Sequence, residues 1–155
     1  MIRPYTRKDA NYIIHSHYEL YNREFHYDLS FRDFIAKSVD GFIKRDDGRE
    51  NIWIIEIEGK RSGSISIKKV NDHTAQLGLF LIEPSVRGTG YGRQLIETAL
   101  QFCKKACYKR VILWTNRELT TARRIYENHG FKRMESRKQL LSNKELIEER
   151  WELSF

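Results

Sequence analysis

The sequence predicts a mixed α+β fold, in which a central, mostly antiparallel sheet of about seven strands is flanked by about four helices. Helix-like and strand-like patterns alternate along the chain and favour this class over an all-β or all-α fold. Tight turns such as Glu58-Gly59-Lys60 separate neighbouring strand patterns, which indicates antiparallel hairpins. One strand-helix-strand crossover, from residues 74–82 to residues 111–115, requires a parallel pair within the same sheet.

The chain opens with a short strand and two helices. Residues 2–5 are predicted to form the strand, and Asp9 is expected to cap a helix that continues to about Phe25. A second helix is expected from about residue 30 to 42, because apolar residues recur there at helical spacing and Gly41 lies near its end.

Three strands follow, at residues 52–57, 64–68 and 74–82. The second alternates and has one polar face, whereas the third is nearly all apolar, which is typical of a strand buried on both faces at the centre of a sheet. Gly78 interrupts the third strand. A glycine inside a strand indicates a bulge or a close approach of another backbone.

The last part of the chain contains two more helices and three strands. After a glycine-rich turn, an inward apolar stripe predicts a helix that contains Cys103, and residues 111–115 form the next strand. Asn116 is expected to cap a helix that Gly130 stops. Strands at 131–137 and 147–155 are then expected to pair antiparallel across a polar loop at 142–144.

Composition and charge fit one globular domain spanning residues 1–155. The net charge of +7 is spread along the sequence, which favours a basic surface that attracts an anionic cofactor over a nucleic-acid partner. The charged opening segment and the lack of about 18 consecutive apolar residues predict a cytoplasmic protein without a membrane span. Cys103 and Cys107 have no nearby histidine ligands, so we expect no metal site.

The most informative stretch is the glycine-rich turn Arg87-Gly88-Thr89-Gly90-Tyr91-Gly92-Arg93, between a strand and a helix. Backbone N–H groups and the helix dipole favour an anion at that position, such as a pyrophosphate. The turn lacks the Gly-Lys-Ser/Thr ending of the phosphate loop of nucleotide hydrolases. It also lacks the third glycine that a dinucleotide-binding fingerprint needs at Arg93.

The turn resembles the acyl-CoA signature of the GNAT superfamily of N-acetyltransferases, Q/R-x-x-G-x-G/A, and Ile82-Glu83-Pro84 precedes it as in that family. A second similar block consists of Asn116, Ala122, Tyr126 and Gly130-Phe131. The N-terminal half resembles acetyltransferase domains often fused behind repressors of the multiple-antibiotic-resistance type. We expect that domain to stand alone here, so no DNA-binding role carries over.

This resemblance implies acetyl-CoA as the co-substrate and no metal. It implies that the strands at 74–82 and 111–115 splay apart and that the pantetheine arm lies between them. Backbone groups of Leu81 and Ile82 would hold that arm, amides of the glycine turn would take the pyrophosphate, and Asn116 would belong to the cofactor site. The unpaired backbone groups of splayed strands need partners of this kind.

The implied reaction is direct attack of a neutral amine on the acetyl thioester in a ternary complex. Tyr126 matches the position of the usual acid, and the N–H of Ile82, or one near it, would stabilise the developing oxyanion. Gln76 stands near the place where some members have a glutamate that serves as base. The identity of the base therefore stays open. The candidates are Glu24, Glu56 and Glu58, or a chain of water molecules instead of a side chain.

The acceptor is expected to be an amine of a small molecule or a peptide. His17, Tyr21 and Glu24 lie on one helical face, which is either a partly exposed polar face or the wall of a pocket for a cationic amine. A monomer or a homodimer fits the sequence. The alternative function is a non-catalytic acyl-CoA-binding sensor, and a basic nucleic-acid-binding protein is a weaker third possibility.

Overall fold

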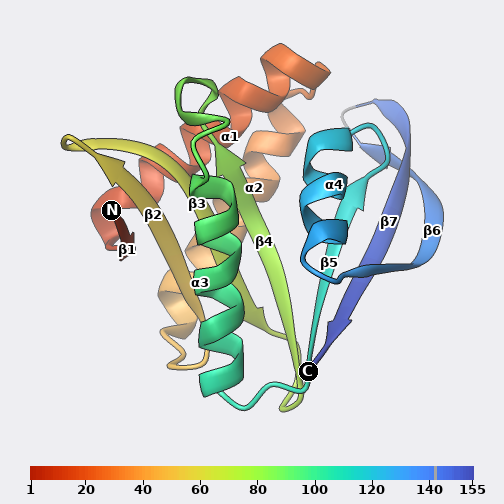
Figure 1. Cartoon of the computed structure of the whole chain (residues 1–155). Coiled ribbons are helices and arrows are strands. Elements are labelled where there is room, and N and C mark those ends of the chain that lie inside the picture. The colour runs from red at the N-terminus through yellow and green to blue at the C-terminus, as the bar shows by residue number, and fades with distance from the viewer. Residues whose placement is uncertain (142) are drawn as a thin grey trace.

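The computed structural model describes residues 1–141 and 143–155, so residue 142 of the predicted polar loop lies outside the described residues. In this part of the chain, seven strands form one sheet in the order β1-β2-β3-β4-β5-β7-β6 (Figure 1). Neighbouring strands are antiparallel except β4 and β5, which are parallel. The predicted fold class is confirmed. The strands are β1 (Ile2–Pro4), β2 (Asn51–Ile57), β3 (Lys60–Lys69), β4 (Thr74–Ile82), β5 (Arg110–Asn116), β6 (Lys132–Leu141) and β7 (Lys144–Ser154).

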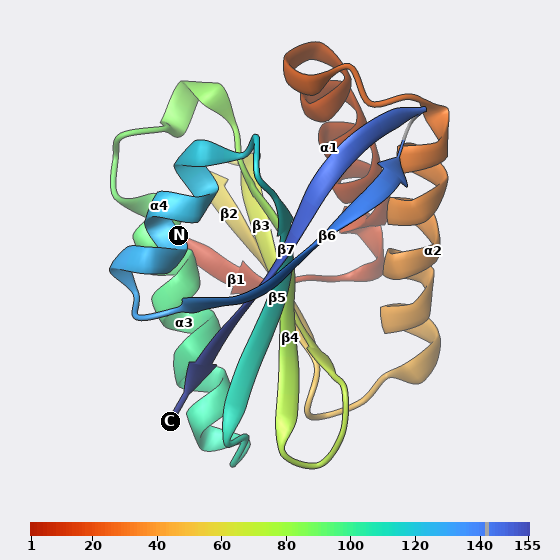
Figure 2. The same ribbon diagram turned by 90° about the vertical axis from the view of Figure 1, so that its right-hand side faces the viewer.

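Helices cover both faces of the sheet. Figure 2 shows α3 and α4 on one face and α1 and α2 on the other. The described helices are α1 (Ala10–Phe25), α2 (Leu29–Arg45), α3 (Tyr91–Lys105) and α4 (Thr120–Asn128), with short 3-10 turns η1 (Arg7–Asp9) and η2 (Pro84–Val86). Each helix presents an apolar stripe to the sheet, and burial of these stripes provides the main stabilisation.

The core has two parts, one on each face. On the α3 face, Leu95 and Cys103 pack with Ile67 of β3, and burial raises the pKa of the Cys103 thiol to about 12. On the other face, Ile13 and Ile35 pack with Ile54 and its neighbours of β2. Ser64 and Ser66 of the polar face predicted for β3 are also buried, because α1 and α2 cover that side of the sheet, whereas Lys68 is exposed.

The central feature is the divergence of β4 from β5. The two strands share only three register pairs, Thr74–Gln76 with Arg110–Ile112, and Figure 1 shows them parting beyond that point. The bulge predicted at Gly78 is confirmed: Gly78 pairs with Ser66, and Leu81 pairs with Ser64, so the bulge adds one residue to β4. Leu79 in the bulge has φ of 45°, a left-handed conformation that costs on the order of 1–2 kcal/mol for a residue with a Cβ.

The predicted cap of the fourth helix is wrong. Leu119, not Asn116, precedes the first helical residue of α4. Asn116 ends β5, and its Nδ2 donates a hydrogen bond to the hydroxyl of Tyr27 at 2.6 Å. Because the amide of Asn116 is engaged across the sheet, it does not bond to the backbone at the start of α4. The strand β6 is also longer than predicted, because its pairing with β7 continues to Leu141.

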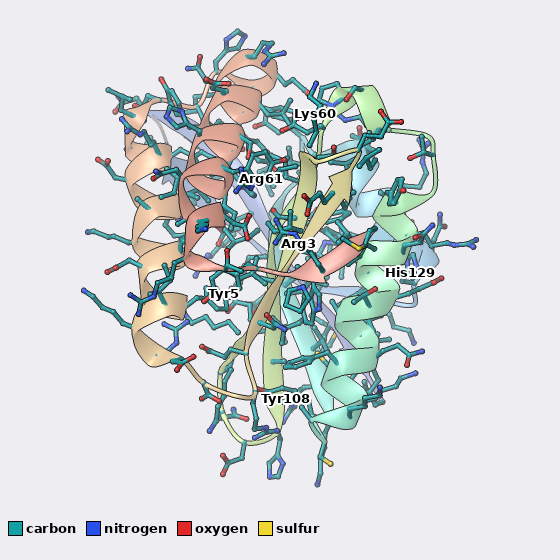
Figure 3. The ribbon with its side chains drawn as sticks, turned by 90° about the vertical axis from the view of Figure 1, so that its left-hand side faces the viewer. Arg3, Tyr5, Lys60, Arg61, Tyr108 and His129 are labelled. Atoms are coloured by element: carbon teal, nitrogen blue, oxygen red, sulfur yellow. The ribbon has the colours of Figure 1, made fainter. Side chains whose placement is uncertain are left out.

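Two buried carboxylates stabilise separate parts of the sheet. Asp9 accepts hydrogen bonds from Arg3 of β1 at 2.9 Å and from Arg61 of β3 at 2.7 Å. These bonds, chiefly that from Arg3, hold the pKa of Asp9 well below its usual range. Both arginines are labelled in Figure 3. Glu149 of β7 is equally buried and accepts from a group of donors: Arg117, Arg123, Arg133 and Trp151.

Candidate active site

A cavity of about 400 Å³ lies against the open half of β4, beside the glycine turn and α4. Most residues predicted to hold the cofactor line it: Leu81, Ile82, Arg87, Gly88, Gly90, Gly92 and Arg93. Thr89 and Tyr91 do not. The hydroxyl of Thr89 donates to the carbonyl of Val86, and Tyr91 begins α3 and packs against the core. We name this space the cofactor cavity.

The glycine turn lines the cofactor cavity at the start of α3. Gly88 and Gly90 have φ of 78° and 88°, and a Cβ at either position would meet nothing within 4 Å. The N-terminus of α3 has no side-chain cap, so its first N–H groups are available to a ligand. An open turn with free amides at a helix N-terminus suits a pyrophosphate. The residues present therefore fit the phosphate end of CoA.

An ion pair lies at the edge of the cofactor cavity. Arg87 donates to both carboxylate oxygens of Glu24, at 2.9 and 3.2 Å, and its Nε also donates to the carbonyl of Ile82 at 3.3 Å. Glu24 is therefore held in an ion pair with Arg87 and is not free to act as a base. Glu56 pairs with Arg3, and Glu58 is exposed in the turn between β2 and β3. Of the three glutamates considered as base, only Glu24 lines a cavity described here.

A second cavity, of about 660 Å³, lies between α1, α2 and the strands β3 to β7. We name it the acceptor cavity. Four residues line both cavities: Tyr21, Phe80, Leu119 and Ala122. Because β4 and β5 have parted at this level, the cavities adjoin through the gap in the sheet. A molecule in each cavity would meet the other at these residues.

His17 lines the acceptor cavity, and only 2% of it is exposed. The interpretation as a partly exposed polar face is therefore wrong for His17. Its Nδ1 lies 2.7 Å from the carbonyl of Ile13, so Nδ1 is assigned the proton, and Nε2 has no hydrogen-bond partner among the described residues. Burial lowers the pKa of His17 to about 4. The backbone carbonyls of Ile13 and Leu79 raise this pKa, but they offset the effect of burial only in part. His17 thus presents a neutral, unpartnered ring nitrogen.

Tyr126 of α4 also lines the acceptor cavity. Its ring packs between Phe80 and Phe131, with centroid distances of 6.0 Å to each, so it belongs to the core as well. Burial raises the pKa of Tyr126 well above its usual value. The phenol is therefore protonated throughout the physiological pH range and can donate a hydrogen bond.

Tyr27 is a site residue that the sequence reasoning missed. It follows α1, and its hydroxyl donates to Glu118 at 3.0 Å while accepting from Asn116. Its ring stacks on Tyr21 at 5.6 Å, and it lines the acceptor cavity. Asn116 is placed in the same cavity, away from the glycine turn. A contact between residues 27 and 116 leaves no local pattern in the sequence that could have revealed it.

None of the described helices is long and apolar enough to cross a membrane. Over the same residues, no three or more His, Cys, Asp or Glu side chains gather where they could hold a metal ion.

Comparison with known proteins identifies relatives. Residues 13–131 match the model of the acetyltransferase (GNAT) family. N-acetyltransferase 8B of Homo sapiens is 31% identical over 86 residues, covering 52% of this chain and 38% of that protein. The uncharacterized N-acetyltransferase MJ1207 of Methanocaldococcus jannaschii is 24% identical over 140 residues, covering 86% of this chain and 61% of that protein. The chain thus spans less than two thirds of the length of each of these curated relatives.

The fold also matches solved structures. The yncA protein of Salmonella typhimurium, described as a putative acetyltransferase with its cofactor acetyl-CoA, superimposes with a TM-score of 0.78 at 14% identity. The match covers 99% of this chain and 92% of that chain. At this identity the likeness is one of fold.

Proposed function

The chain belongs to the GNAT acetyltransferase family, whose co-substrate is acetyl-CoA, and on that premise we propose that it transfers an acetyl group from acetyl-CoA to a primary amine within a ternary complex. The observation that supports the proposal is that two cavities adjoin where β4 and β5 part. Two substrates, one in each cavity, meet there, so a transfer needs no covalent enzyme intermediate.

Backbone groups account for most of the cofactor binding that we propose. The amides from Arg87 to Arg93 take the pyrophosphate, and Leu81 and Ile82 pair with the amide-bearing arm along the free edge of β4. Bound acetyl-CoA supplies an activated acetyl thioester. The N–H of Ile82 is the donor that we assign to the carbonyl oxygen of that thioester.

Tyr126 is the acid in this proposal. It lies on the helix that lines both cavities, beside Phe80 at their junction, and its raised pKa keeps the hydroxyl protonated. The hydroxyl donates to the departing sulfur, which would otherwise leave as an unsolvated anion.

The proton of the amine leaves on the acceptor side. His17 offers the lone pair of Nε2, and its lowered pKa suits it to receive a hydrogen bond from an amine or a water rather than to keep a proton. Glu24 becomes available only when Arg87 releases it. We therefore assign Tyr21 and Glu24 to the walls beside the amine and His17 to orienting it.

The test is thiol release from acetyl-CoA on addition of pooled amines, together with calorimetric titration of CoA. We expect CoA binding, and thiol release only when an amine is present. Binding without amine-dependent release would instead indicate the acyl-CoA sensor. Failure of CoA to bind at high concentration would refute both functions.

The role of Tyr126 has its own test. We expect Tyr126→Phe to lower the turnover number by about 10²-fold or more with little change in CoA affinity. Tyr18→Phe, on α1 and outside both cavities, is the matched control and should turn over like the wild type. Unchanged turnover in Tyr126→Phe would remove its role as acid.

A further inference from the structure

The acceptor cavity is lined by more positive than negative charge. Its cationic side chains are Lys37, Arg45, Lys68 and Arg137, and its one lining carboxylate among the described residues is Glu148. Arg137 forms an ion pair with Glu148, through hydrogen bonds of 2.6 and 2.9 Å. Arg45 pairs with Glu50 at 2.8 Å. Lys37 of α2 and Lys68 of β3 have no ion-pair partner in the described part of the chain.

Lys68 is placed beside Gln76. The two residues are register partners on β3 and β4, and both line the acceptor cavity. Gln76 also pairs with Ile112 of β5, in the last of the register pairs that β4 and β5 share, so this position is the closed end of the gap. Some members of the family that the chain resembles carry a glutamate near this register. A glutamate would neutralise Lys68, whereas the amide of Gln76 leaves its charge free and adds a hydrogen-bond donor.

This basic end of the cavity is remote from the reaction point. Gln76 and Phe80 are four residues apart on β4, which corresponds to at most about 13 Å, since the bulge at Gly78 and Leu79 shortens this stretch. The wall between the two ends is largely aromatic, and it includes Tyr27, Phe31 and Trp114. His17, with its unpartnered Nε2, lines the same stretch. The cavity thus presents a cationic end, an aromatic middle and an opening to the cofactor cavity.

We propose that the acceptor is an elongated primary amine whose far end carries an anionic group, a carboxylate or a phosphate, which Lys37, Lys68 and Gln76 bind at the closed end of the gap. The inference rests on the proposed function and deepens it by naming the class of acceptor. The amine reaches the junction of the cavities while the anion stays on the two lysines. Charge-assisted hydrogen bonds of this kind discriminate strongly between charged and uncharged ends.

The test uses two matched series of acceptors. One series is glycine, β-alanine, γ-aminobutyrate, ε-aminohexanoate and ω-aminooctanoate, and the other is the alkylamines of the same lengths. We expect kcat/KM to favour the carboxylate by about tenfold or more for the two longest members and not for glycine, since only a long chain spans both ends. The phosphate ester of a long amino alcohol is a third arm that distinguishes phosphate from carboxylate.

Substitution of the lysines locates the anion site. Lys68→Gln and Lys37→Gln should each reduce the preference for the long acid over its alkylamine, mainly through KM, and Lys68→Glu should reverse it. Lys44→Gln on α2 is the matched control, because Lys44 pairs with Asp40 and does not line the cavity. It should keep the preference of the wild type.

The outcomes separate this inference from the proposed function. If alkylamines are acetylated as fast as the long amino acids of equal length, the proposal of an anionic acceptor is overturned, whereas the proposed acetyltransferase activity stands. A preference for acids that survives in both lysine variants would also overturn it. Calorimetry of the CoA complex with ω-aminooctanoate gives a readout without turnover, and no binding there at millimolar concentration would overturn the inference. The broad amine panel independently decides whether the protein is an acetyltransferase.

Discussion

Acidification should destabilise this protein through His17. The side chain is fully buried as a neutral ring, and burial lowers its pKa to about 4 from an ordinary value of 6.5. No charged side chain contributes to this shift; besides burial, only the carbonyls of Ile13 and Leu79 do. Between these two pH values the unfolded chain binds a proton at His17 that the folded chain does not bind. The stability from neutral His17 is therefore fully present above about pH 6.5 and is lost as the pH falls towards 4.

The size of this loss follows from the shift. A difference of 2.5 pKa units, from 6.5 to about 4, corresponds to roughly 3 kcal/mol in the free energy of unfolding. This is a large part of the total stability of an ordinary domain. Asp9 and Glu149 have lowered pKa values, so the stability that they contribute is lost only near and below the pH at which free carboxyl groups titrate. The range from pH 6.5 to about 4.5 therefore isolates His17.

Urea unfolding at half-unit steps from pH 7.5 to 4.5 measures the effect. His17→Phe keeps a ring of similar volume and has no titrating nitrogen, so its free energy of unfolding should vary much less with pH, whatever its value at neutral pH. His15→Phe, exposed on the same helix, should keep the slope of the wild type. If the wild type and His17→Phe lose stability in parallel, the reasoning about the buried neutral ring is refuted.

Three further predictions concern the turn and the ion pairs. Gly90→Ala, at φ of 88°, should weaken CoA binding measured by calorimetry and lower the free energy of unfolding by about 1–2 kcal/mol; unchanged affinity would contradict the role of the turn. Glu24→Gln should release Arg87 and tighten CoA binding a few-fold at low salt, and the gain should shrink at high salt. Glu149→Gln should cost roughly 3 kcal/mol in urea unfolding, because its arginine partners lose a buried carboxylate, whereas exposed Glu145→Gln should cost less than about 0.5 kcal/mol.

Features set by neighbouring residues could be predicted from the sequence. The apolar run of β4 predicts a central strand, Gly78 predicts a bulge or a close backbone approach, of which the structure has the bulge, and Gly88 and Gly90 predict a turn before a helix. Each depends on the properties of a few consecutive residues, so the pattern is visible without a structure. The motif also directed attention to the side of the sheet where the cofactor cavity lies.

Features set by packing could not be predicted in the same way. The face of His17, Tyr21 and Glu24 is polar in the sequence, yet His17 is buried because α1 lies against β4. The side chain of Asn116 has the chemistry of a helix cap and bonds instead to Tyr27, 89 residues away. Lys37 of α2 and Lys68 of β3 line one cavity only because the fold brings α2 to the side of the sheet that Lys68 faces. Each of these depends on elements brought together only by the complete sheet.

The parting of β4 and β5 divides the sheet into two arms, and the buried carboxylates are distributed accordingly. Asp9 ties together β1, β3 and η1 in one arm, and Glu149 ties together β6, β7 and α4 in the other. Each arm thus has its own ionic network and does not depend on pairing across the gap. The arms are joined by two hydrogen bonds, in which Tyr27 donates to Glu118 and Lys144 donates to the carbonyl of Phe25, and both acceptor residues line the cofactor cavity. Beyond the three register pairs that β4 and β5 share, side-chain hydrogen bonds rather than strand pairing therefore hold the two arms together, which leaves the backbone edges of the gap to a cofactor.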